Sequence, residues 1–137
     1  MTRQEKYPDT STFHFYNANP HGRYTDDCVI RAICRAANEK YETVLKELTE
    51  ICLKTGFTFT DKCCYEKYLL SKGWIKHNQP RKADNTKYTG KEFCERCRDY
   101  ENYIAHIGGH HIVAIVDGKV NDVWDSTNGC IGNYWTK

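Results

Sequence analysis

Hydrophobic residues recur every three or four positions through the middle of the chain, a spacing that predicts amphipathic helices. Val29, Ile33 and Ala36 form the first such face, so we expect a buried helix over residues 25–37. Thr25 is suited to cap its N-terminus, because a hydroxyl accepts a hydrogen bond from a free backbone N–H.

Three further helices follow from the same kind of evidence. Apolar positions at helical spacing predict the second and third helices, and a glycine stops each of them. A threonine with a glutamate three positions later forms a capping-box pattern, which predicts a short fourth helix. The expected boundaries are Tyr41 to Gly56, Asp61 to Gly73, and a start at Thr89 with Glu92 as the box partner.

The last third of the chain reads as strands. Residues 111–116 are almost continuously apolar, which predicts a central strand buried on both faces. Asp117 and Gly118 form a strong hairpin signal that returns the chain along residues 120–125. Other strands are expected at residues 12–16, as a short edge strand, and at 103–107 and 130–135, with a possible strand start at 74–76.

These elements predict an α+β fold in a single domain over residues 1–137. Residues 1–24 form a lead-in loop, residues 25–100 are mainly helical, and residues 101–137 form an antiparallel sheet. The N-terminal helices pack on that C-terminal sheet.

The amino-acid composition indicates the class of protein but no particular chemistry. The chain has 137 residues, of which 39% are hydrophobic and 28% charged, which is typical of a globular domain. Its net charge of +2 is too small to indicate nucleic acid. No apolar run approaches the ~20 residues of a membrane span, and the N-terminus has no hydrophobic signal region. We therefore expect a cytoplasmic protein with no membrane partner.

Eight cysteines are many for this length. Without a secretion signal we expect reduced thiols, metal ligands or one catalytic thiol rather than disulfides. Cys94 and Cys97 form a CxxC pair, and the adjacent Cys63 and Cys64 are the other possible zinc ligands. Structural zinc sites usually combine two separated pairs, and adjacent cysteines on a helix point apart. We therefore predict no metal and no other cofactor.

Cys28 opens the first helix, where free N–H groups and the helix dipole favour a thiolate. Cysteine in a buried helix is also often just a small hydrophobe. A nucleophile needs a base and an orienting group, and His111 begins the central strand; its neighbour His110 is a rival. Opposite positions in the predicted hairpin have numbers that sum to about 235. His111 then faces Trp124, within one residue of Asp125, which we predict to accept a hydrogen bond from the imidazole.

A cysteine at a helix start, a histidine at a strand start and an aspartate one hairpin later resemble the papain-like cysteine peptidases, most of all their small bacterial and phage-type members. The resemblance implies a papain-like fold, with Cys28 as nucleophile, His111 as general base and acid, and Asp125 as the orienting residue. It also implies hydrolysis of a peptide or isopeptide bond, or related acyl transfer, on a protein or peptide substrate. The matching residues are 27–32, 111–118 and 123–126.

Many papain-like enzymes place a glutamine about six residues before the cysteine to polarise the substrate carbonyl, and here that position is Gly22. The Cys28 backbone N–H remains as a donor. Asn17 and Asn19 are the candidate side-chain donors for the oxyanion.

Two other functions stay open at this stage. A catalytically inactive papain-like scaffold that binds a partner protein needs no activated thiol. A small nucleic-acid-binding protein would use aromatic residues among basic ones, but the basic residues gather mainly in one loop, residues 76–91. That distribution favours a solvated loop beside an aromatic core.

Overall fold

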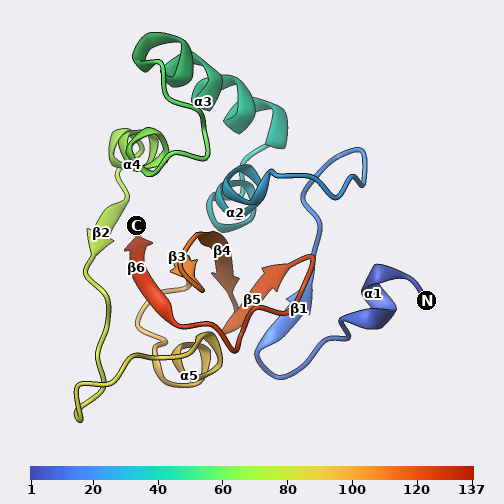
Figure 1. The fold of residues 1–137 in the computed structure, drawn as a ribbon, viewed down its shortest axis with the longest axis vertical. Helices are drawn as coiled ribbons and strands as arrows, with labels where there is room; N and C mark the ends of the chain where they lie inside the picture. The colour runs from blue at the N-terminus through green and yellow to red at the C-terminus, as the bar shows by residue number, and fades with distance from the viewer.

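The computed structural model describes residues 1–137 as five helices and one six-stranded mixed sheet (Figure 1). The strands run in the order β1-β5-β4-β3-β6-β2, so β4 lies inside the sheet, as predicted. Neighbouring strands are antiparallel except β1 and β5, which are parallel. The strands are β1 (Phe13–Phe15), β2 (Ile75–His77), β3 (Asn102–Ile107), β4 (His111–Val116), β5 (Lys119–Asp122) and β6 (Ile131–Thr136).

The prediction of a wholly antiparallel sheet is therefore wrong at one edge. Parallel neighbours need a long connection between them. The four helices and three strands that separate β1 from β5 in the sequence supply it. β1 itself was expected as a short edge strand, and it is one.

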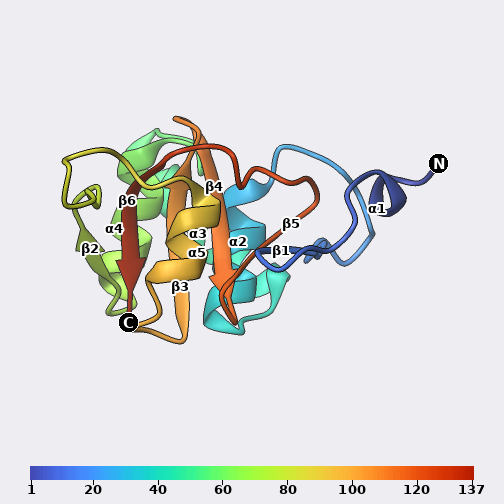
Figure 2. The ribbon, with the colours of Figure 1, turned by 90° about the horizontal axis from the view of Figure 1, so that it is seen from below.

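The helices divide between the two faces of the sheet. Three of them gather on one face and α5 covers the other, as the views in Figures 1 and 2 agree. The short α1 lies to the side, near β1. The helices are α1 (Arg3–Lys6), α2 (Cys28–Ala37), α3 (Tyr41–Thr55), α4 (Lys62–Ser71) and α5 (Gly90–Arg96).

The two faces carry separate hydrophobic clusters, and β4 contributes to both. Ile112 and Ala114 belong to the cluster beneath α2, α3 and α4. Val113 and Ile115 belong to the cluster on the α5 side. Alternate side chains point to opposite faces of a strand, so a strand covered on both sides needs an unbroken apolar run.

The start of α2 differs from the expectation in a way that matters for the site. The helix begins at Cys28, and its N-cap is Asp27 rather than Thr25. The Asp27 side chain does not cap the backbone, because its carboxylate accepts hydrogen bonds from Arg31 and other side chains. The α3 stop at Gly56 is as predicted, with a φ of 79° in the left-handed region that glycine adopts easily.

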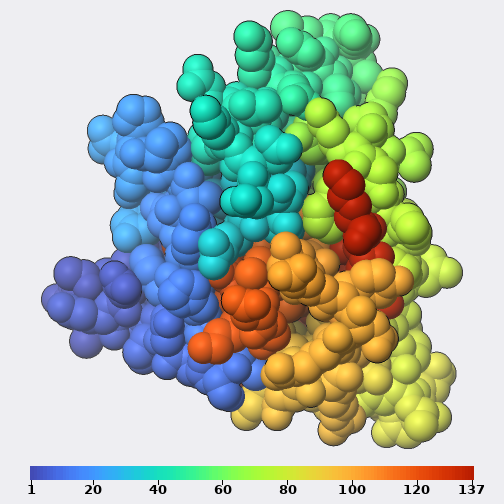
Figure 3. Space-filling model, turned by 180° about the vertical axis from the view of Figure 1, so that it is seen from behind, coloured from blue at the N-terminus to red at the C-terminus, as the bar shows by residue number.

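The first 24 residues are more structured than the lead-in loop that we expected. They include α1, which a capping box between Thr2 and Glu5 begins, and β1, whose Phe13 is fully buried. The segment, in blue, lies along one side of the molecule up to the start of α2 (Figure 3). The predicted capping box at Thr89 is confirmed at the start of α5. No helix is both long enough and apolar enough to cross a bilayer.

Candidate active site

Three hollows of the surface meet at the first residue of α2. Cys28 and Asp26 line all of them, and the volumes are about 730, 630 and 270 Å³. The Cys28 side chain is partly exposed, and its thiol is free. The first residues of a helix also carry backbone N–H groups without an intrahelical partner. A thiol at this junction is accessible from several directions.

His111 stands beside this thiol at the start of β4. Its Nε2 hydrogen-bonds the carboxylate of Asp122 at the end of β5, which leaves Nδ1 for Cys28. Burial on its own would lower the pKa of His111, but the hydrogen bonds and charges of Asp122 and Cys28 outweigh it and raise the pKa to about 9. His111 is therefore protonated at neutral pH, and an imidazolium beside a cysteine favours its thiolate.

Asp122 remains ionised although it is almost completely buried. Burial favours its neutral form, but hydrogen bonds and charges from His111 and Arg31 lower its pKa overall. Arg31 Nη1 donates to Asp122 Oδ1 at 2.5 Å. A carboxylate held ionised behind an imidazole fixes the tautomer and the orientation of the ring.

A buried network holds Asp122 from behind. Arg31 also donates from Nε to Asp27 at 2.7 Å. Asp27 in turn accepts from the Tyr41 hydroxyl at 2.7 Å and from the Asn19 amide at 3.1 Å. Burial would lower the pKa of Arg31, but the two carboxylates raise it overall. Each charge of the network thus has an opposite partner, which a buried ion needs.

The hydrogen bond from the His111 imidazole goes to Asp122 and not, as we predicted, to Asp125. Asp125 lines the largest hollow, but its Oδ1 accepts from the Thr127 backbone at 3.0 Å and from the Thr127 hydroxyl at 2.6 Å. It therefore holds the turn after β5 rather than the imidazole.

The register prediction itself is confirmed, since Ala114 pairs with Asn121 and their numbers sum to 235. In that register Asp122 is the diagonal neighbour of His111 on the same face. β5 ends at Asp122, so Asp125 lies beyond the paired strand, in the turn that follows it. The alternation of side chains was thus the signal in the sequence that could have identified Asp122.

Neither predicted oxyanion donor lies in the cleft. Asn17 donates from its amide to the Arg23 carbonyl at 3.1 Å, and Asn19 donates to Asp27. Both side chains hold the loop that precedes α2, and the structure does not bring them to Cys28.

A second histidine lies on the other side of the cleft. The ring of His106 on β3 meets the Tyr65 hydroxyl on α4 at 2.5 Å, and both side chains line the 630 Å³ hollow with Cys28. Burial, with a contribution from the charge of Lys62, lowers the pKa of His106 to about 4. Burial also raises the pKa of Tyr65. This pair is neutral at pH 7.

Trp124 forms part of the cleft wall on the His111 side. Its ring centre lies 5.0 Å from that of His111, and the side chain lines two of the three hollows. An aromatic ring beside the imidazole excludes water from it and offers an apolar surface to a substrate. His110, the rival histidine, also lines the cleft, but the carboxylate hydrogen bond belongs to His111.

The cysteines that suggested zinc lie apart. Cys64 belongs to the cluster beneath α2, α3 and α4, and Cys94 to the cluster on the α5 side of the sheet. No group of three or more histidine, cysteine, aspartate or glutamate side chains is placed to hold a metal ion.

Comparisons of the chain with family models, with curated proteins and with solved structures found no match in any of the three. The functional argument therefore depends on the geometry of the cleft.

Proposed function

We propose that the protein is a thiol acyl-transfer enzyme of papain-like architecture, a cysteine peptidase or isopeptidase. Cys28 is the nucleophile, His111 the general base and acid, and Asp122 the orienting residue. The observation that supports this most is the position of the His111 ring, between a thiol at a helix start and a buried carboxylate that hydrogen-bonds its Nε2.

The reaction follows from these three side chains. The Cys28 thiolate attacks the carbonyl carbon of an amide or ester, and the carbonyl oxygen takes up the displaced electron pair. When this intermediate collapses, the carbon–nitrogen or carbon–oxygen bond breaks, and His111 gives its proton to the leaving group. The acyl group is then a thioester on Cys28. Water or an amine, deprotonated by His111, attacks the thioester and releases the thiolate.

A protein or peptide is the substrate that fits this cleft. Hollows extend from Cys28 in several directions and are open to solvent, so an extended chain can pass the nucleophile and leave groups on both sides of the scissile bond. We also place the enzyme in the cytoplasm, where reducing conditions would keep a catalytic Cys28 as the free thiol that the proposed reaction needs.

The test is the rate of iodoacetamide labelling at each cysteine against pH, followed by mass spectrometry. We expect Cys28 to react at least ten times faster than the exposed Cys63 and Cys130 below pH 7, where ordinary thiols are protonated (about tenfold per pH unit). His111→Ala should abolish this advantage, and His110→Ala, its neighbour in the cleft, should keep it. If Cys28 reacts like an ordinary thiol in the wild type, the proposed function is wrong.

A further inference from the structure

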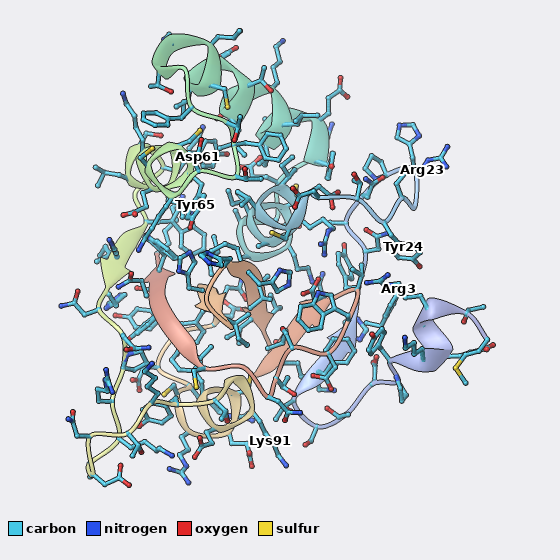
Figure 4. All side chains as sticks on the ribbon, viewed as in Figure 1. Arg3, Arg23, Tyr24, Asp61, Tyr65 and Lys91 are labelled. Atoms are coloured by element: carbon cyan, nitrogen blue, oxygen red, sulfur yellow. The ribbon has the colours of Figure 1, made fainter.

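The third and smallest hollow, of about 270 Å³, is lined by a positively charged side chain that has no role in the reaction described above. Arg3, Cys28 and His111 all line it, together with Tyr24 and Trp124. Arg3 is on α1, far from Cys28 in the sequence, but its side chain lines the same hollow. Figure 4 shows Arg3 and Tyr24 side by side, between α1 and the sheet.

The Arg3 guanidinium is held by its environment. Its Nε donates to the Val123 carbonyl at 2.7 Å, and its central carbon lies 4.8 Å from the centre of the Tyr24 ring. The two terminal nitrogens donate to no protein acceptor. A guanidinium held at one nitrogen and placed over a ring has restricted motion, so its remaining N–H groups form a donor pair beside the hollow.

The proposed reaction needs a donor of this kind. On attack, the negative charge moves from the Cys28 sulfur to the substrate oxygen, away from the imidazolium of His111. Fixed donors at the new position of the charge are usually the largest single source of rate enhancement. The first residue of α2 supplies one backbone N–H, but the side chains of Asn17 and Asn19 are occupied elsewhere.

Arg3 is the cationic side chain of this hollow that forms no ion pair. Arg31, which also borders the hollow, is shared between Asp27 and Asp122, and His111 is bonded to Asp122. Resting on the proposed function, we propose that Arg3 is a catalytic residue, and that it stabilises the oxyanion together with the Cys28 backbone N–H. The N-terminal segment thereby completes the site, and its capping box and its hydrogen bond to Val123 serve to position Arg3.

The experiment compares two reactions of the same sulfur. Acylation by p-nitrophenyl acetate passes through a tetrahedral oxyanion, whereas alkylation by iodoacetamide forms none. Both rates are measured at Cys28 by mass spectrometry, with Cys28→Ser to subtract the reaction of the other thiols. The variants are Arg3→Met, Arg3→Lys, Arg3→Ala for rescue by guanidinium ion, and a matched control, Arg23→Met, in an exposed arginine that lines none of the three hollows.

We expect Arg3→Met to lower the ratio of acylation to alkylation by about 10²- to 10³-fold, the usual loss for one oxyanion donor. Arg3→Lys should retain part of the ratio, Arg23→Met all of it, and guanidinium ion added to Arg3→Ala should restore part of it. An unchanged ratio in Arg3→Met overturns the inference, whether both rates persist or fall together, because Arg3 then acts on the thiolate or the fold. Failure of the proposed function is recognised separately, by ordinary labelling of Cys28 in the wild type.

Discussion

Two histidines on adjacent strands flank the cleft, and at pH 7 one of them is protonated while the other is neutral. His111 on β4 and His106 on β3 are five residues apart in the sequence, and each places Nε2 against an oxygen atom. The pKa of His111 is raised to about 9, and that of His106 is lowered to about 4. Both rings are substantially buried, so burial alone does not explain the difference.

The hydrogen-bond partners of the two imidazoles explain the difference between their pKa values. Burial lowers the pKa of each imidazole, but at His111 the hydrogen bonds and charges of Asp122 and Cys28 reverse this effect, whereas Tyr65 offers His106 a neutral hydroxyl. A buried ionised partner, itself stabilised by Arg31, thus keeps one imidazole protonated. The other imidazole, of His106, stays neutral and lines the same cleft.

Replacing the partner of His111 should have the largest effect. In Asp122→Asn the imidazole loses the charge that holds its proton and its tautomer, so we expect acyl-transfer activity to fall by about 10³- to 10⁴-fold. The measurement is the rate of Cys28 acylation by p-nitrophenyl acetate at pH 7, beside the pH profile of iodoacetamide labelling.

Asp125→Asn is the matched control. An asparagine oxygen can still accept from Thr127, so the turn should persist and the rate should stay within about threefold of the wild type. Equal losses in the two variants would contradict the assignment of Asp122 and would return Asp125 to consideration.

The same two aspartates show how far the sequence could predict the site. The apolar run, the Asp117–Gly118 turn and the hairpin register are properties of neighbouring residues, and the structure confirms them. Cys28 and His111 follow from their places at the starts of two elements. The choice between Asp122 and Asp125 depends on where β5 ends, because only Asp122 lies in the strand on the same face as His111, whereas Asp125 belongs to the turn.

Other parts of the site depend on contacts between distant segments. Asp27 and Arg31 are four residues apart on one helix, but nothing local indicates that the same guanidinium also holds Asp122. The place of Arg3 depends on how the N-terminal segment packs against the end of β5. The parallel pairing of β1 with β5 depends on that packing as well. Hydrophobic periodicity contains no information on such pairings.

The dependence of stability on pH should separate the two histidines. The folded-state pKa of His111 is above its ordinary value of 6.5, so its contribution to stability is complete below about pH 6.5 and is lost as the pH rises through about 9. The folded-state pKa of His106 is below that value, so its contribution is complete above about pH 6.5 and is lost as the pH falls toward 4. A difference of this size at His111 is worth about 3 kcal/mol at most.

Urea unfolding between pH 4 and pH 10 measures this dependence. His111→Gln should flatten the alkaline loss of unfolding free energy and leave the acid side unchanged, whereas His106→Gln should flatten the acid side. Titration of the two imidazoles by NMR gives the same pKa values directly. An alkaline loss that persists in His111→Gln would show that His111 is not the group that titrates near pH 9.

Removing the hydroxyl of Tyr65 should have the smallest effect and tests whether the partner of His106 matters at all. Tyr65→Phe deletes one buried hydrogen bond without opening a cavity, which should cost about 1–2 kcal/mol of unfolding free energy. Because burial rather than Tyr65 lowers the pKa of His106, that pKa should remain far below 6.5 in the variant. Tyr68→Phe is the control, since Tyr68 is equally buried on the same helix and its hydroxyl makes no hydrogen bond to another protein group. A His106 pKa near 6.5 in Tyr65→Phe would mean that the phenol, like Asp122 at His111, sets the protonation of its imidazole.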